Sequence, residues 1–585
     1  MILLTLSVSI LGAWALCAAV LMGIGGTILR WLGLPLHPAC AFWLGLAGAV
    51  PALETYHLLR PIDSVAVALL VAWGVWGLAT NRPLLGQLIG DSRALHPAFQ
   101  FALAATLIIL SVRASGPCEH YDTGLYGAAT VRWFTTYPAV PGLANLHGRL
   151  GFNSSLLSLV AVLNQGLATP LAFRITAGLL VLVAACLVLT SVSRLLGDSN
   201  SSFDWYRAVL IVPLTFWIFH GDLVGTNTDI PASILSLFAL QHLFRAFHPA
   251  PTTGDPVSPR SDLLVSLALL SLGVTFKLST ATLAVGASTI AFLKLASADF
   301  APQEKRRTLK MAFLIPLISL LPWIGHGFIL SGYPAYPSSA LGLPVDWRLP
   351  VQSVQLVRAG VQAWARQPHT SLQAASGTLW LGPWFQHARA DREGFLFPLS
   401  LAAFGAVSII AAGWRRKANR SIATFLPLLA IICGMVSWFY LAPALRFAEG
   451  LFWSFPAVLA GLGVPALLDR IQVSSRAPLH ILLAGGAVLA LLSVYPRTLW
   501  KTSFRPAFAT RQYSPFPPAD VIPVRNPNGV TILIPRSGNQ CWDAPLPCSA
   551  YLNPTLRLRG AGGLRTGFVS DNLPPNAEWV SSRTQ

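Results

Sequence analysis

Apolar runs of about 20 residues recur along most of this chain, and a helix of that length crosses the hydrocarbon core of a bilayer. Hydrophobic residues make up 54% of the 585 residues and charged residues only 11%, whereas a soluble domain carries about 25% charged residues. We therefore expect an all-α, polytopic integral membrane protein. The first run is too long for a signal peptide and lacks a basic start, so we interpret it as a span.

The apolar runs also predict the number of spans and the organisation of the chain. We expect about 14 transmembrane helices, within a range of about 12–14 because several runs are short. They cover residues 2–29, 38–57, 64–80, 98–112, 171–195, 208–219, 229–247, 263–276, 278–296, 311–330, 395–413, 421–442, 451–468 and 479–495. The predicted regions are N-terminal spans (1–113), a polar loop (114–155), a membrane core (156–330), a second polar loop (331–394), C-terminal spans (395–495) and a polar tail (496–585).

The formal net charge of +18 would suit a nucleic-acid-binding protein, but its distribution argues against that partner. Lys and Arg are clustered in short loops between spans, most densely at 305–310 and 415–420. The positive-inside rule places such loops in the cytoplasm. The 114–155 loop, the 331–394 loop and the tail then lie on the opposite, external face of a multi-pass protein of the cell (inner or plasma) membrane.

The two later polar regions have different compositions. The 331–394 loop contains Trp347, Trp364, Trp380 and Trp384, which favours interfacial helices lying along the lipid headgroups, although such rings also stack on sugars. The tail is rich in Pro, Asn, Arg and Ser, with one strand-like run at 530–535. We expect it to be a small external α/β or irregular region that packs on the membrane face.

Two cysteines in the tail are candidates for a disulfide. Cys541 and Cys548 are seven residues apart around two prolines, a spacing that suits a small closed loop in an oxidising compartment. Free thiols and a bond with Cys118 are the alternatives.

The first polar loop carries the leading candidate for catalysis. The segment Cys118-Glu119-His120-Tyr121-Asp122 continues with Thr-Gly-Leu-Tyr shortly after a predicted span. An ionised Asp122 can accept the proton of a substrate hydroxyl that lies within hydrogen-bonding reach. Glu119 and His120 are weaker candidates, and a solvated loop aspartate is the alternative for Asp122.

A second acidic site is predicted at Asp222 and Asp229. Asp229 lies in Thr228-Asp229-Ile230-Pro231, which is also a good helix start, so capping alone would explain it. The predicted topology nevertheless puts this helix start on the same face as Asp122.

Four basic residues are candidates for binding a substrate phosphate. His147 and Arg149 lie in the first polar loop, Lys277 interrupts two apolar runs, and Arg446 lies in a short external turn. A lysine at that depth needs water or an anion. Headgroup contact is the alternative for His147 and Arg149, snorkelling for Lys277, and pairing with Glu449 for Arg446.

These features resemble the GT-C glycosyltransferases, membrane enzymes that use polyprenyl-phosphate-linked sugars. The resemblance rests on Asp122 in a large external loop, the Thr-Asp-Ile-Pro helix start and the multispan architecture. The chain is also similar to a group of uncharacterised bacterial multispan membrane proteins, in which the following segments recur. They are Tyr121–Tyr126, Tyr137–Ser155, Lys277–Ser279, Ser331–Pro337, Arg446–Gly450 and Gln540–Cys548.

The resemblance implies a role for each candidate. Asp122 corresponds to the catalytic carboxylate, and Asp229 corresponds loosely to the second acidic position. A lipid-phosphate sugar donor would bind near the basic residues, and Asp122 would deprotonate an acceptor hydroxyl of a glycan, lipid or protein in an inverting displacement. Mg²⁺ or Mn²⁺ bound by Asp122 and Asp229 is an option, although no ligand cluster requires a metal.

The chain departs from the superfamily pattern in one respect, and several other functions also fit its sequence. The superfamily usually has its catalytic loop after the first span, whereas about four predicted spans precede Asp122 here. A polysaccharide polymerase, ligase or flippase of envelope glycan assembly would also be multispan and basic outside. A solute transporter would carry its charges at mid-membrane in repeated halves, and no internal repeat is visible in the sequence.

Overall fold

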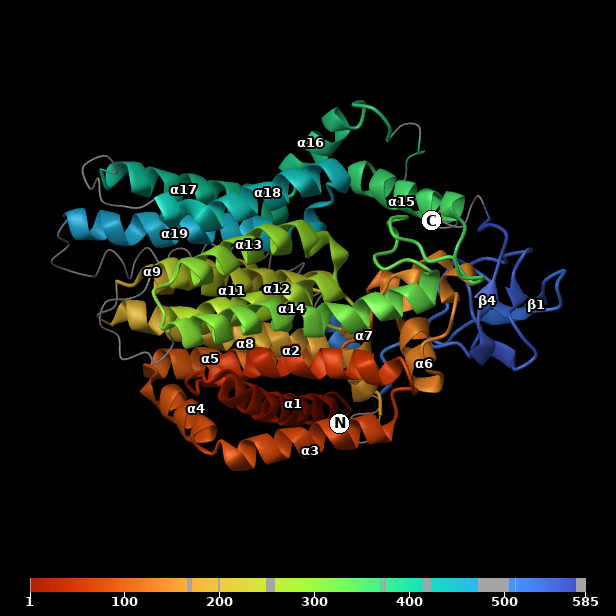
Figure 1. Cartoon of the computed structure of the whole chain (residues 1–585), viewed down its shortest axis with the longest axis horizontal. Helices are drawn as coiled ribbons and strands as arrows, with labels where there is room; N and C mark the ends of the chain where they lie inside the picture. The colour runs from red at the N-terminus through yellow and green to blue at the C-terminus, as the bar shows by residue number, and fades with distance from the viewer. Residues whose placement is uncertain are drawn as a thin grey trace.

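The computed structural model describes residues 2–165, 171–197, 200–248, 258–368, 370, 372, 375–413, 422–471, 504–510 and 512–574. Most of these residues are helical, and the long helices run side by side as one bundle (Figure 1). Within the described residues, 10 helices are long and apolar enough to cross a membrane. The count rises to 11 if the bent pair of α3 (Ser64–Thr80) and the first part of α4 (Pro83–Ala94) forms one span. This architecture is that of a multi-pass membrane protein.

The candidate spans agree closely with the predicted apolar runs, and some acquire a short 3-10 or π-helical first turn. They are α1 (Ile2–Leu32), α5 (Pro97–Ala114), α8 (Ala172–Leu196), α11 (Asp229–Phe247), α12 (Pro259–Phe276), α13 (Ala281–Ser297), α14 (Pro302–Ser331), α17 (Phe397–Ala411), α18 (Leu426–Leu441) and α19 (Glu449–Ile471).

The expected number of about 14 spans is not reached in the described residues. The run at 208–219 is not one span, because α9 (Ser202–Val209) ends and α10 (Ile211–His220) begins within it. A helix as short as α10 rises only about 15 Å, half the thickness of the hydrocarbon core. The run at 38–57 forms α2 (Pro38–His57), whose glutamate and prolines lower its apolar content. The run at 479–495 lies outside the described residues.

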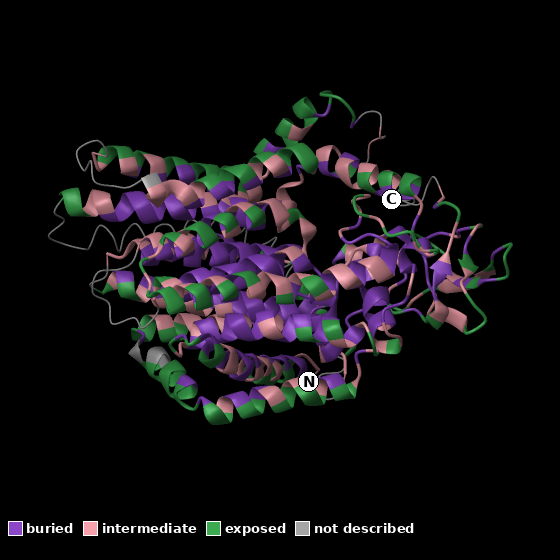
Figure 2. Ribbon diagram, viewed as in Figure 1, coloured by how far each residue is buried: buried purple, intermediate pink, exposed green. Residues whose placement is uncertain are grey.

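Helices α11 and α12 occupy the centre of the bundle, whereas α1, α5, α14, α17 and α18 are mostly exposed on their outer faces (Figure 2). A helix that is apolar all round is stable in either setting, because lipid and protein interior both exclude water. Helix α1 approaches α2 and α3 so closely that a side chain at Gly23 or Gly25 would overlap their backbones. Small residues allow this approach, as is usual between membrane helices.

The polar regions gather at one end of the bundle. Figure 1 shows α6 (Ala128–Thr136), α15 (Val351–Arg366) and the strands of the tail together at this end. The 114–155 loop also contains two 3-10 turns and leads into α7 (Leu156–Leu163). The 331–394 loop forms α15 and α16 (Leu381–Ala390), in agreement with the helices expected in this loop. The three regions therefore share a face, as the charge pattern predicts.

The described part of the tail contains a short helix and two antiparallel strand pairs. After α22 (Arg505–Ala509), β1 (Val521–Arg525) pairs with β2 (Thr531–Pro535), which forms most of the strand-like run at 530–535. The second pair is β3 (Arg557–Leu558) with β4 (Phe568–Val569).

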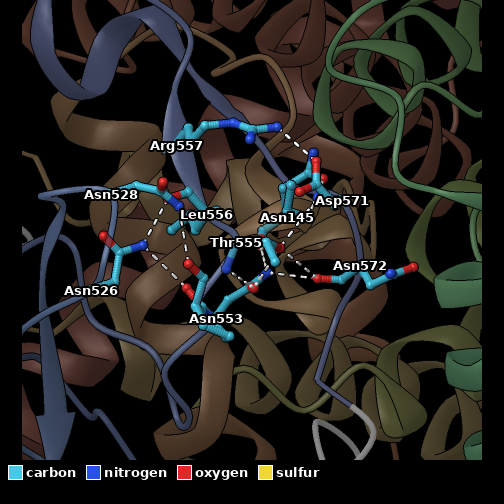
Figure 3. A network of polar contacts seen from close by, with 11 residues as sticks. Asn145, Asn526, Asn528, Asn553, Thr555, Leu556, Arg557, Asp571 and Asn572 are labelled. Carbon is cyan, nitrogen blue, oxygen red and sulfur yellow. Dashed lines mark hydrogen bonds and ion pairs between the residues drawn. The ribbon is translucent and has the colours of Figure 1, made fainter.

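Buried asparagines fasten the tail to the first polar loop (Figure 3). The Asn145 amide donates to the Phe568 carbonyl at 3.3 Å, and Asn553 donates to the Asn145 carbonyl at 3.2 Å. Asn526 in turn donates to the Asn553 and Leu556 carbonyls at 3.2 and 2.7 Å. Each amide satisfies backbone groups that irregular segments leave without partners, and so the network fixes the tail against the loop.

Two buried histidines fasten the same loop to the bundle. His57 of α2 and His326 of α14 share a hydrogen bond of 2.7 Å between Nδ1 and Nε2. The outer nitrogens bind the loop: His57 Nε2 contacts the Tyr137 carbonyl at 3.1 Å, and His326 Nδ1 contacts Asn153 Oδ1 at 2.8 Å. Buried Glu54 lies 3.8 Å from His326 Nδ1. The first polar loop is thus held by contacts with the bundle and by contacts with the tail.

Candidate functional site

The Asp122 segment is positioned by the loop that precedes α11. Thr123 Oγ1 accepts a 2.9 Å hydrogen bond from the Thr226 amide and lies 2.9 Å from His120 Nδ1. Gly127 packs so closely against Thr226 that a methyl group there would overlap its side chain. Because residues 120–127 and 223–227 lie side by side, Asp122 and the start of α11 reach the same place.

Asp122 is surrounded by cations from distant segments. Its Oδ1 lies 3.3 Å from an Arg149 nitrogen, and its Oδ2 lies 3.9 Å from Arg446. Burial opposes ionisation of this carboxyl group, but the charges of Arg149 and Arg446, followed by His120 and Lys277, hold the pKa of Asp122 below its usual value. Asp122 is therefore an ionised carboxylate at neutral pH.

Asp229 forms the second half of the same cluster. It pairs with Lys277 through Oδ1 and lies 3.7 Å from Arg446 through Oδ2. Its amide donates to Asn227 Oδ1 at 2.7 Å, which fixes the first turn of α11. Arg446 thus contacts both acidic residues, and the structure unites Asp122, Arg149, Asp229, Lys277 and Arg446.

Lys277 reaches the cluster from the junction of α12 and α13. Helix α12 ends at Phe276, and the extended backbone of Lys277 separates it from the next 3-10 turn. The ammonium group lies 4.2 Å from the centre of the Phe447 ring, and the Arg446 guanidinium lies 5.2 Å from it. An aromatic face attracts cations, so Phe447 helps to hold both charges in place.

A small cavity lies beside this cluster, and its empty volume of about 300 Å³ includes open solvent. Its lining combines charged, hydroxyl-bearing and apolar residues. The lining consists of Asp229, Ala232, Ser233, Ser236, Lys277, Ser279, Thr280, Leu283, Arg446, Phe447, Ala448, Gly450 and Leu451. The cavity therefore lies among the first turns of α11, α13 and α19, at the end of the bundle where the polar regions gather.

Two tryptophans support the turn that carries Arg446. The Trp384 indole of α16 donates to the Pro443 carbonyl at 2.6 Å, and the Trp438 indole of α18 donates to the Ala444 carbonyl at 2.8 Å. On the other side, Trp217 donates to Glu449 Oε2 at 3.1 Å. The two indole hydrogen bonds therefore fix the turn that carries Arg446, and the Glu449 carboxyl group accepts a hydrogen bond from Trp217.

The remaining acidic candidates lie apart from the Asp122–Asp229 cluster. Glu119 and Asp222 are exposed, and the charges of both act on Arg113 at the end of α5. Burial and the charge of Asp222 raise the pKa of Glu119. Arg113 also donates to the Gly221 carbonyl at 2.8 Å, so this group joins the end of α5 to the segment after α10.

His147 occupies a buried position next to the tail. Its Nδ1 accepts a 3.3 Å hydrogen bond from the Arg149 amide, and its ring stacks on Tyr551 at 4.9 Å. Burial and the charge of Arg149 lower the pKa of His147 to about 3. The imidazole is therefore neutral at pH 7, and its contacts orient Arg149. Burial likewise lowers the pKa of His120, although the nearby Asp122 and Asp222 act in the opposite direction.

The cysteine alternatives are resolved in the structure. Cys541 and Cys548 form a disulfide bond. Cys118 is a buried free thiol that donates to the Val224 carbonyl at 3.2 Å.

The donor set fits an anion better than a divalent metal. Asp122 and Asp229, the proposed metal ligands, already lie against Arg149, Lys277 and Arg446. In the part of the chain that the structure describes, no group of three or more His, Cys, Asp or Glu side chains is arranged to hold a metal ion. Mg²⁺ or Mn²⁺ would have to displace these cations to reach the carboxylates.

Several contributors to the site were not among the candidates from the sequence. Phe447, Thr123, Thr226 and Trp384 act through partners that are distant in the chain, and Trp438 acts through nearby Ala444. No local motif distinguishes them from ordinary apolar or hydroxyl residues. The short-range signal for Phe447 was its place directly after Arg446.

No curated protein and no solved structure matches this chain. A family model described as "Domain of unknown function (DUF8201)" matches residues 8–453. The match spans the five residues of the cluster, from Asp122 to Arg446, and ends before the tail. The chain therefore belongs to the DUF8201 family.

Proposed function

We propose that this protein is a membrane glycosyltransferase that moves a sugar from a polyprenyl-phosphate donor to a cell-envelope glycan, lipid or protein. The observation that carries the proposal is the shared position of Arg446 between Asp122 and Asp229, beside Lys277 and the cavity. A carboxylate next to a cation-lined cavity supplies both functions that such a transfer needs: a base for the acceptor and charge for the departing phosphate.

The charges of the cluster suit an anionic ligand. Three cations, Arg149, Lys277 and Arg446, gather around the two carboxylates of Asp122 and Asp229. A phosphate in the cavity would lie against Lys277 and Arg446, the two basic residues of its lining. The carboxylates hold these cations in position until the phosphate competes for them.

The cavity walls suit the rest of the donor. Leu283 and Leu451 offer apolar surface next to a lipid, and Ser233, Ser236 and Thr280 offer hydroxyls to the polar part. Because the cavity lies among membrane helices, a prenyl chain can remain in the bilayer while the phosphate reaches Lys277 and Arg446. An acceptor would approach from the polar loops, on the periplasmic or extracellular face.

The reaction is a single displacement. The acceptor hydroxyl oxygen attacks the anomeric carbon, its proton passes to a carboxylate oxygen of Asp122, and the bond from the anomeric carbon to the phosphate oxygen breaks. The electron pair of that bond leaves with the lipid phosphate, whose charge Lys277 and Arg446 stabilise. When phosphate occupies Arg446, Asp122 loses part of the positive field that lowers its pKa, and it becomes a stronger base.

The proposal is tested with purified protein in liposomes that contain a radiolabelled polyprenyl-phosphate sugar and bacterial envelope extract as acceptor. We expect release of polyprenyl phosphate and a product of inverted configuration. Growth of long chains would instead indicate a polymerase, and transfer of a finished chain a ligase. Movement of intact donor across the bilayer would indicate a flippase, and uptake of free sugar a transporter; either of these two would overturn the proposal.

A further inference from the structure

A short segment of the tail lies directly on the Asp122 loop. We name residues 539–543 the tail strap. Asn539 Oδ1 accepts a 2.5 Å hydrogen bond from the Tyr121 hydroxyl, and Gln540 Nε2 donates to the Tyr121 carbonyl at 3.0 Å. The Trp542 amide donates to the Gly124 carbonyl at 2.9 Å. The strap therefore contacts the loop on both sides of Asp122.

The last residue of the strap extends the contact to α6. Arg132 pairs with Asp543 at 2.7 Å, and its side chain also donates to the Asp543 carbonyl at 3.1 Å. The side chain of Cys541, which is also part of the strap, forms the disulfide bond with Cys548.

The strap is itself attached to the rest of the protein at two points. The segment closed by its disulfide is fixed to β2, because the Leu533 amide donates to the Pro547 carbonyl at 2.9 Å and the Ser549 amide donates to Leu533 at 3.0 Å. Trp542 packs on Phe516 at 5.8 Å, and Phe516 packs on Phe173 of α8 at 4.7 Å. The strap is thus a fixed support with one attachment in the tail and another in the bundle.

The fit between strap and loop requires a glycine at position 124. A Cβ atom on Gly124 would lie 2.7 Å from the Gln540 amide nitrogen and 2.8 Å from the Trp542 ring. Atoms at that separation overlap, so the side chains of Gln540 and Trp542 pack directly on the Gly124 backbone because no side chain separates them. This close contact is what allows the strap to fix the backbone next to Asp122.

We infer that the tail strap positions Asp122 for the reaction, acting through Tyr121 and Gly124. Its effect on catalysis rests on the proposed function, whereas its effect on the loop does not. The family match ends at residue 453, so the tail adds a support from outside the matched region. Strap residues touch the loop that carries Asp122, and they are positioning residues.

The strap should affect turnover more than donor binding. Lys277 and Arg446, which would bind the phosphate, come from the α12–α13 junction and the turn before α19, away from the strap contacts. A displacement of about 1 Å at a reacting group can cost about 100-fold in rate. Loosening the strap should therefore lower kcat by about 10-fold to 100-fold and leave the KM for donor within about 2-fold.

The test compares three variants with the wild-type full-length protein. Cys541→Ser with Cys548→Ser opens the strap, and Gln540→Ala removes one contact while keeping the disulfide. Arg557→Gln is the matched control, because it breaks an exposed 2.7 Å pair with Asp571 elsewhere in the same tail. Hydrogen–deuterium exchange is measured over residues 119–132 and over α11, together with kcat and KM.

We expect faster exchange at residues 119–132 in the first two variants, with α11 unchanged, and the predicted loss of kcat. Arg557→Gln should behave as wild type. Unchanged exchange at 119–132 in both strap variants would overturn the inference, and so would a rise in KM with kcat preserved. If the double variant does not fold, Gln540→Ala alone decides. If wild type transfers no sugar, the proposed function fails, while the exchange result still decides whether the strap holds the loop.

Discussion

Asp122 and Asp229 are joined through one guanidinium, since Arg446 lies 3.9 Å from the first carboxylate and 3.7 Å from the second. This link brings a loop residue and a helix-start residue, far apart in the chain, into one charged cluster. A ligand that binds Arg446 therefore alters the surroundings of both carboxylates at once.

Replacing Lys277 should destabilise the protein, because the negative charge of Asp229 would lose its partner. Lys277→Met leaves Asp229 with only the more distant Arg446, and we expect a loss of about 3–5 kcal/mol in stability because breaking a buried pair leaves one charge behind. Adding Asp229→Asn should restore part of that loss. Thermal unfolding in detergent measures the stability of the single variants and of the double variant. A double variant that is as unstable as the sum of the two single variants would show that the pair is not coupled.

Arg446 should contribute mainly to donor binding. Arg446→Gln removes a charge-assisted contact to phosphate, worth about 1.5–3 kcal/mol, and should raise the KM for donor about 10-fold to 100-fold. Arg446→Lys should fall between wild type and this variant, because lysine keeps the charge and loses the forked geometry. Initial rates against donor concentration give the comparison. Equal KM values for wild type and Arg446→Gln would remove Arg446 from the binding site.

The buried His147 should make stability depend on pH. Its pKa is about 3 in the folded protein against an ordinary value of 6.5, so the unfolded chain binds the extra proton between these values. Stability from this group is complete above pH 6.5 and is lost as the pH falls toward 3. Between pH 7 and pH 5 we expect a loss of about 2 kcal/mol.

The matched variant is His147→Asn, whose side-chain oxygen can still accept from the Arg149 amide. The difference in unfolding free energy between wild type and this variant should shrink by about 2 kcal/mol from pH 7 to pH 5. Unfolding in mixed micelles at several pH values measures it. A difference that is constant with pH would mean that His147 does not titrate in this way.

The pair of His57 and His326 should be needed for a well-held loop. His326→Phe fills a similar volume but leaves His57 Nδ1 and Asn153 Oδ1 without a partner, at a cost of about 1–3 kcal/mol. Trp323 on the same helix donates to the Asn153 carbonyl and so provides a second contact to the same loop residue. Melting temperatures of His326→Phe and Trp323→Phe should both fall. An unchanged melting temperature for His326→Phe would contradict the role of the pair.

Much of the helical fold could be predicted from the sequence, because an apolar run of span length has few other stable structures. The bounds of α2 and α11 agree with the runs at 38–57 and 229–247. The prediction of one span at 208–219 was wrong because it followed hydropathy alone, whereas α9 ends at Val209 and α10 begins at Ile211 with Pro213 in its first turn. Proline has no N–H to donate to the preceding turn, so a helix often ends just before it, and hydropathy does not reveal this break.

The charged members of the site could be proposed because ionisable residues next to membrane spans are costly and so attract attention. Asp122, Asp229, Lys277, Arg149 and Arg446 do meet in the structure. Their supports could not be proposed, because a contact such as Tyr121 with Asn539 joins residues that share no local pattern. For His147 the sequence indicated a basic loop residue, but stacking on Tyr551 buries it.

In the proposed mechanism, Asp122 deprotonates the acceptor hydroxyl. The most direct measurement is the rate of polyprenyl phosphate release in proteoliposomes for wild type, Asp122→Asn and Asp571→Asn, the last being an exposed carboxylate in the tail. We predict that Asp122→Asn lowers the rate by at least about 100-fold with the fold intact, and that Asp571→Asn equals wild type. Transfer by Asp122→Asn at the wild-type rate would show that Asp122 is not the base in this reaction.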